Sequence, residues 1–125
     1  MLNVQADVRR RLSEMLAPVP VKVSVPENMP DEFVTVRRDG GAWQNDLLDK
    51  AGLEIYAWAK SEADACALAE KTAKAMASLS FEDGYASVRM EQMCSDADPN
   101  TRKPRWYLSY TIKNFKPTEQ RRDNG

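Results

Sequence analysis

The sequence contains no histidine and only two cysteines in 125 residues. Without histidine the chain lacks the most common general base and the most common metal ligand, so Ser-His and Cys-His catalytic pairs are excluded. Cys66 and Cys94 lie far apart and match no spacing typical of zinc or thioredoxin-like sites. The residues form no recognisable catalytic constellation. We therefore expect a protein that is not an enzyme and that needs no metal and no cofactor.

Long apolar runs are also missing, and no stretch approaches the roughly 18 residues that a membrane-spanning helix requires. Residues 1–7 are acidic and amphipathic instead of leading into the apolar core of a signal peptide. We expect a cytoplasmic protein with reduced thiols and no membrane partner. The 18 basic and 19 acidic side chains give a net charge of −1, which provides no general attraction to nucleic acid.

The apolar content is sufficient for one domain. Hydrophobic residues make up 42% of the chain, and 125 residues is a length typical of a single domain. Such a domain buries about two thirds of the surface that its unfolded chain exposes. We expect a single domain over residues 1–116 and a polar, flexible tail over residues 117–125.

Apolar residues at helical spacing predict two amphipathic helices. The first covers residues 4–16, with Asn3 as its N-cap and Pro18 and Pro20 beyond its end. Its apolar positions are Val4, Val8, Leu12, Met15 and Leu16. The second is Ala-rich, opens at the capping box that begins with Ser61, and runs to about Leu79. Lys71, Lys74 and Ser78 lie on its predicted solvent side.

Alternating residues predict five strands, over residues 21–25, 32–38, 50–59, 86–93 and 105–114. Asp39-Gly40-Gly41 predicts a break after the second strand, so residues 39–49 are expected to form a loop longer than a hairpin needs. The element order predicts an α+β fold. We expect a two-layer sandwich with about five mostly antiparallel strands and two helices packed on one face.

The predicted loop 39–49 carries the first candidate contact surface. Apolar residues on a loop are expected either to fold back over their own sheet edge or to dock on a neighbouring subunit. The candidate subunit or tube interface consists of Arg37, Arg38, Trp43, Gln44, Leu47 and Leu48. If subunits associate head to tail, the two arginines would meet acidic residues such as Asp46 and Asp49 on the next copy. The alternative is that the arginines are ordinary solvated surface.

A second loop, residues 96–104, leads to a basic cluster. Arg102, Lys103 and Arg105 are a candidate phosphate or partner contact, because basic residues beside aromatic ones can grip a phosphate backbone. Against this reading, the adjacent Trp106 alternates in step with Leu108 and is better placed in the core. Asp96 and Asp98 are a weak candidate for a cation site because no third ligand is suitably spaced.

Four segments carry a familiar pattern: residues 26–41, 53–59, 62–70 and 98–106. With the opening helix, they make the chain from about Val4 to Phe115 resemble the tail terminator (tail completion) proteins of long-tailed bacteriophages and prophages. The resemblance implies a small subunit that forms a six-membered ring on the end of the tail tube, stops tube growth and presents a surface to the head-tail connector protein.

The implied partners are copies of the chain, the tail tube protein and the connector protein, with DNA passing through the ring without specific binding. The implied location is the host bacterial cytoplasm during assembly and then the head-proximal end of the virion tail. Two alternatives stay open. One is another neck, head-completion or minor tail protein, and the other is a small nucleic-acid-binding module that uses Arg102, Lys103 and Arg105.

Overall fold

A five-stranded sheet and two helices form the two layers of the protein. The structure is a computed structural model, and it describes residues 3–43 and 48–115, with only the backbone of residues 41–43 and 48. The elements in chain order are α1 (Val4–Met15), β1 (Val21–Lys22), β2 (Phe33–Trp43), β3 (Leu48–Trp58), α2 (Glu62–Ser78), the 3₁₀ turn η1 (Leu79–Phe81), β4 (Tyr85–Ser95) and β5 (Arg105–Phe115).

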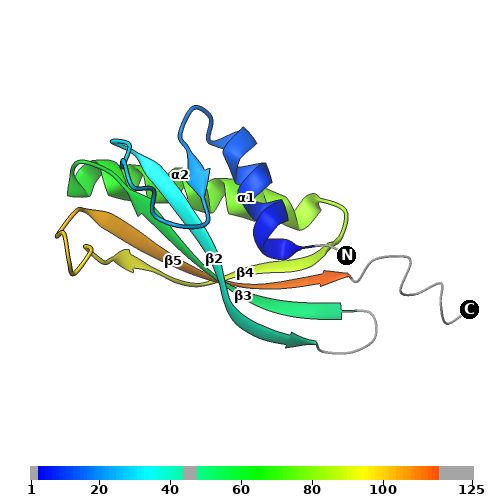
Figure 1. The fold of residues 1–125 in the computed structure, drawn as a ribbon. Coiled ribbons are helices and arrows are strands. Elements are labelled where there is room, and N and C mark those ends of the chain that lie inside the picture. The colour runs from blue at the N-terminus through cyan, green and yellow to red at the C-terminus, as the bar shows by residue number, and fades with distance from the viewer. Residues whose placement is uncertain (1–2, 44–47, 116–125) are drawn as a thin grey trace, which may run out of the picture.

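The strand order is β1-β2-β3-β5-β4. Among the described residues, β1 pairs in parallel with β2, and the other three strand pairings are antiparallel. Both helices pack against the same face of the sheet (Figure 1). The predicted α+β fold, with mostly antiparallel strands and two helices on one face, is confirmed.

Side-chain caps fix the starts of both helices, as the sequence predicts. The Asn3 side-chain carbonyl accepts a hydrogen bond from the Ala6 amide at 3.0 Å, and the Ser61 hydroxyl accepts one from the Asp64 amide at 3.1 Å. Each cap satisfies an amide that has no partner inside its helix. The predicted inward position of Met15 is wrong, because this side chain is 44% exposed at the end of α1.

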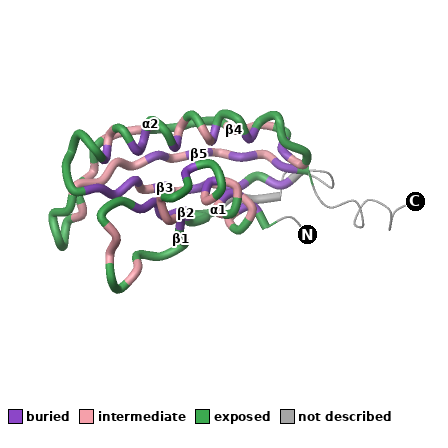
Figure 2. Tube along the Cα trace, turned by 90° about the horizontal axis from the view of Figure 1, so that it is seen from above, coloured by how far each residue is buried: buried purple, intermediate pink, exposed green. Residues whose placement is uncertain are grey.

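The core lies between the helices and the sheet. Every second strand residue points toward the helices, and buried and less buried positions alternate along β3 and β5 (Figure 2). Completely buried members of this core include Val8, Leu12, Ala69, Met76, Leu53, Ile55, Ala57, Leu108 and Ile112. Each large aliphatic side chain buried in this way stabilises the fold by about 1.5–3 kcal/mol.

The predicted loop over residues 39–49 is wrong, because β2 continues to Trp43 and β3 begins at Leu48. A β-bulge between Arg38 and Gly40 accommodates the residues that suggested a break. Gly40 has a φ of 144°, which favours glycine, and a Cβ on Gly52 would lie 2.3 Å from Asp39 Oδ1. The glycines therefore permit a bulge instead of ending the strand.

The predicted strand over residues 21–25 is shortened to the two residues of β1. Val21 pairs with Val34 and Lys22 with Thr35, after which the chain leaves the sheet. Val23 and Val25 are 40% and 44% exposed. The alternation of valines in this segment therefore gives a largely exposed segment and not a longer strand.

Candidate functional site

The face of the sheet opposite the helices is a candidate interaction surface, which we call the open face. Neither helix covers it (Figure 1). Its residues follow from the strand register, in which Thr35 lies opposite Tyr56, Tyr56 opposite Tyr107, and Trp58 opposite both Phe33 and Arg105. The part of the open face at the start of β5 therefore brings together one arginine, Arg105, and four aromatic residues. These are Phe33, Tyr56, Trp58 and Tyr107.

Arg105 is the centre of the aromatic cluster. Its guanidinium carbon lies 4.0 Å from the centre of the Tyr56 ring and 5.1 Å from that of Trp58. Phe33 stacks on Trp58 with ring centres 5.1 Å apart, and Tyr107 lies 5.2 Å from Tyr56. Cation–π contacts of this kind are each worth about 0.5–2 kcal/mol, with the larger values where water is excluded. The cluster forms an aromatic platform in which Phe33 and Trp58 are almost completely buried, at 1% and 3% exposure, whereas Tyr56 and Tyr107 are partly exposed.

Arg105 also ties the β4–β5 connection to this platform. Its side chain is 13% exposed, its Nε donates to the Asp96 carbonyl oxygen at 2.6 Å, and its terminal nitrogens lie 3.5 Å from carboxylate oxygens of Asp96 and Asp98. Hydrogen bonds from the Thr101 side chain and amide hold the pKa of Asp98 below its usual value. The charge of Arg105 is thus matched within the chain.

This geometry separates the three residues of the predicted phosphate or partner contact. Arg102 and Lys103 are exposed near the end of the β4–β5 connection, whereas Arg105 is held among aromatic rings and carboxylates. The weak cation-site hypothesis for Asp96 and Asp98 gains no support, because both carboxylates face Arg105. Within residues 3–43 and 48–115, no group of three or more acidic or cysteine side chains is arranged to hold a metal ion.

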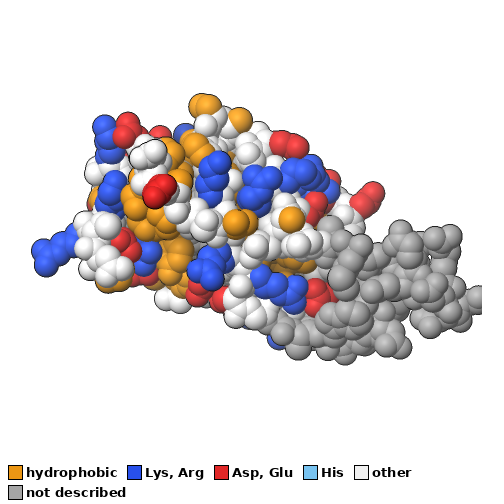
Figure 3. Space-filling view, in the orientation of Figure 1, with side chains coloured by type: hydrophobic (Ala, Val, Ile, Leu, Met, Phe, Trp, Pro, Cys, Tyr) orange, Lys and Arg blue, Asp and Glu red, His pale blue; other side chains and the backbone are white. Residues whose placement is uncertain are grey.

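A shallow groove of about 180 Å³ runs over the platform. The half-exposed Val23 and Val25 stand on one side of it, and Arg37 and Glu54 form its polar end. Burial raises the pKa of Tyr56 in the floor, and the nearby Arg105 opposes this effect. In the half of the molecule that holds the start of α2, Figure 3 shows apolar side chains gathered beside Lys and Arg. Such a surface suits an apolar partner with a charged border.

Arg37 and Arg38 lie on opposite faces of β2. Arg37 points to the groove on the open face. Arg38 instead donates to the Gly40 carbonyl at 3.0 Å and pairs with Asp49 at 3.3 Å. The pairing of Arg38 with Asp49 is therefore within one copy and not between copies.

The remaining residues of the predicted interface are only partly covered by the structure. Gln44 and Leu47 lie outside the described residues, as does Asp46. For Trp43 and Leu48 the backbone alone is described, and it places them opposite Asp49 and Phe115 near the end of the β2–β3 hairpin. The hairpin brings these positions to one end of the sheet (Figure 1).

The sequence matches no protein-family model and no curated protein. Among the described residues, no helix combines the length and the apolar character needed to cross a bilayer.

Sequence reasoning missed three exposed apolar residues. Val23 and Val25 were assigned to a strand, and Phe81, which is 90% exposed, was not considered as a contact residue. The proline residues on both sides of the valine segment were a signal that its strand would be short. The exposure of Phe81 depends on how the turn after α2 is anchored, which no local pattern reveals.

Proposed function

We propose that the chain is a structural subunit of a bacteriophage or prophage tail. Copies assemble into a ring, six-membered by the resemblance, which caps the tail tube and joins it to the head-tail connector protein. The chain acts by contact and carries out no chemical reaction. It works at the head-proximal end of the virion tail after assembly in the host cytoplasm, and DNA passes through the ring without specific binding.

The observation that carries the proposal is the open face. A two-layer domain covers one side of its sheet with helices, and the other side here presents the partly exposed Tyr56 ring beside the half-exposed Val23 and Val25. Clustered exposed apolar residues with a polar border are typical of protein–protein contacts. Together with the resemblance over most of the chain, this surface supports assembly as the function.

A nucleic-acid-binding module is supported less well. Its basic patch would need Arg105, which pairs with Asp96 and Asp98 and is 13% exposed. The two exposed residues Arg102 and Lys103 would remain, and nonspecific binding generally depends on several phosphate contacts. A duplex-binding titration at low and physiological salt separates the two functions, because phosphate contacts predict a steep loss of affinity with salt.

The open face can be tested with the double variant Val23→Asp/Val25→Asp. Charges at these positions should prevent burial of the open face against another subunit, because an unpaired buried carboxylate is very unfavourable. We expect ring particles of the wild-type protein, counted by negative-stain microscopy and light scattering, to disappear in the variant. The melting temperature should change by no more than about 3 °C because both side chains are exposed in the monomer.

Ala97→Asp, which adds one charge at an exposed position of the β4–β5 connection, is the matched control and should assemble normally. Intact rings in the double variant would show that the open face is not a subunit contact. A large drop in the melting temperature would show that the two valines belong to the core.

A further inference from the structure

Phe81 is the most exposed large apolar side chain among the described residues, with 90% of its surface accessible. It sits at the end of η1, directly after the long helix α2. An aromatic side chain buries about 150–250 Å² when it docks, and aromatic residues dominate the binding energy of interfaces. A fully presented phenylalanine is therefore a strong candidate for an anchor.

Burial of Leu79 and several hydrogen bonds hold the turn that carries Phe81. Leu79 is 1% exposed and fixes the turn in the core, while the Ser80 hydroxyl donates to the Ala77 carbonyl at 2.9 Å. The Glu82 amide donates to the Leu79 carbonyl at 3.0 Å, and the φ of 95° at Gly84 lets the chain turn into β4. Because the backbone is held in this way, docking of Phe81 requires little additional ordering.

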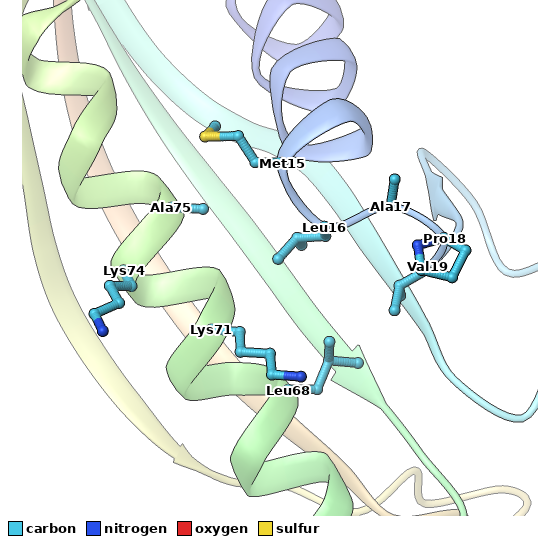
Figure 4. A pocket seen from close by; sticks show the side chains of 9 residues that line it. All are labelled: Met15, Leu16, Ala17, Pro18, Val19, Leu68, Lys71, Lys74 and Ala75. Carbon is cyan, nitrogen blue, oxygen red and sulfur yellow. The ribbon is translucent and has the colours of Figure 1, made fainter.

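A groove on the helical side has the size and chemistry to receive such a ring. Its volume is about 460 Å³, and it lies between the end of α1 and the middle of α2 (Figure 4). The lining residues are Met15, Leu16, Ala17, Pro18, Val19, Leu68, Lys71, Lys74 and Ala75. In Figure 4, Leu16 and Ala75 point toward each other from the two elements, and the aliphatic part of Lys71 runs along α2 toward Leu68.

The charges around the two features are complementary. Asp83 and Glu82 follow Phe81 and are exposed, although Glu82 also pairs with Arg11 at 3.1 Å, whereas Lys71 and Lys74 border the groove and are also exposed. Neither lysine forms an ion pair within the part of the chain that the structure describes. Opposite charges placed around an apolar contact favour the matching orientation of two partners.

We infer that Phe81 of one copy docks into the α1–α2 groove of a second copy, with Glu82 and Asp83 facing Lys71 and Lys74. The occupant is another copy because this chain supplies both an apolar anchor with acidic neighbours and an apolar groove with basic borders. The contact would join neighbouring subunits. It rests on the proposed function because both require copies of the chain to associate. It is separate from the open face.

The test uses two variants that each damage one side of the contact. Phe81→Asp removes the anchor but keeps the groove, and Lys71→Glu/Lys74→Glu reverses the border of the groove but keeps the anchor. Both affect exposed side chains, so circular dichroism melting should show folded proteins. We expect each variant to self-associate at least about 30-fold more weakly than the wild type by sedimentation equilibrium, as loss of an interface hot spot does.

Mixing the two variants is the decisive measurement. The intact Phe81 of the lysine variant can enter the intact groove of the Phe81→Asp variant, so a mixed complex should form although neither protein associates alone. Met90→Asp, which adds a charge at another exposed apolar position, is the control and should associate like the wild type.

Three results would overturn the inference. These are a wild-type protein that stays monomeric at the highest soluble concentration, a Phe81→Asp variant that associates normally, and a mixture that forms no complex. If Phe81→Asp changes only the binding of a tail tube protein, Phe81 docks on that protein and not in the groove of a second copy. The first of these results would also contradict the ring particles expected under the proposed function, whereas the other two would leave that function intact. Tube length tests the capping function independently.

Discussion

Asp7 joins α1 to the first residue of β4, Tyr85. Its carboxylate accepts hydrogen bonds from the Tyr85 hydroxyl at 2.5 Å, from Arg11 at 2.9 Å and from Arg10 at 3.0 Å, and Arg11 also pairs with Glu82 at 3.1 Å. Burial raises the pKa of Asp7, but the hydrogen bonds from Tyr85, Arg11 and Arg10 lower it by more, so the net pKa is below the usual value. Ionised Asp7 therefore stabilises the fold.

The pH dependence of stability should show this effect. A carboxylate with a lowered pKa in the fold stabilises the protein above the unfolded pKa, near 3.8, and this stabilisation is lost as the pH falls through the folded pKa. We expect Asp7→Asn to lower the free energy of unfolding at pH 7 by about 1–3 kcal/mol and to lose less stability than the wild type below pH 4. Urea unfolding between about pH 2 and pH 7 measures both effects.

Glu14→Gln is the control for this experiment, because Glu14 is 68% exposed and pairs only with Arg10 among the described residues. It should reproduce the wild-type pH profile. Parallel profiles for the wild type and Asp7→Asn below pH 4 would contradict the account of Asp7.

Among the elements, the distal part of the β2–β3 hairpin is supported by contacts of Arg38. Beyond the bulge at Asp39, β2 has β3 on one side, and β1 has already ended. Arg38 supports this part of the hairpin by donating to the Gly40 and Lys50 carbonyls and pairing with Asp49, while the Arg38 amide donates to the Gln5 side chain at 2.7 Å.

Arg38→Ala should loosen the distal hairpin. Loss of the Arg38 side-chain contacts should cost roughly 1 kcal/mol, since the side chain is partly exposed, and so should raise amide exchange in residues 41–43 and 48–50 about fivefold. Hydrogen–deuterium exchange read by mass spectrometry measures the change. Arg37→Ala, at the neighbouring position on the opposite face, should leave the exchange unchanged. Equal exchange in all three proteins would show that Arg38 does not hold the hairpin.

The helices could be predicted from the sequence because the signals that define them are local. Asn3 and Ser61 cap amides three residues away, and the apolar spacing needs no knowledge of a partner element. The bulged hairpin could not be predicted in the same way. Gly40 and Gly41 alone suggest a break, and only the pairing with residues 51 and 52 of β3 shows that the strand continues.

The candidate site was predicted less completely than the fold. Sequence reasoning placed Trp106 in the core, and the structure shows it partly buried against the core, where it donates to Glu62 at 2.9 Å. The role of Arg105 could not be deduced, because it depends on Tyr56 from β3 and on carboxylates across the β4–β5 connection. Contacts between distant strands set the electrostatics of this surface.

At the scale of the whole molecule, two surfaces on opposite layers are suited to contacts. The open face presents Val23 and Val25 above the aromatic platform. The helical layer presents the α1–α2 groove, and Phe81 follows three residues after the end of α2. A subunit in a closed ring contacts two neighbours through different patches of its surface. In the proposed ring, these surfaces would serve contacts with neighbouring copies and with the tail tube.

The central claim is tested most directly by the length of tail tubes. The tail tube protein from the same genome is polymerised with the wild-type chain, with Val23→Asp/Val25→Asp, or alone, and tube lengths are measured by electron microscopy. We predict that the wild-type chain stops growth and leaves a ring at one tube end, whereas the variant gives the long, heterogeneous tubes of the tube protein alone. Equally long, uncapped tubes with the wild-type chain would contradict the proposal that this protein terminates a tail.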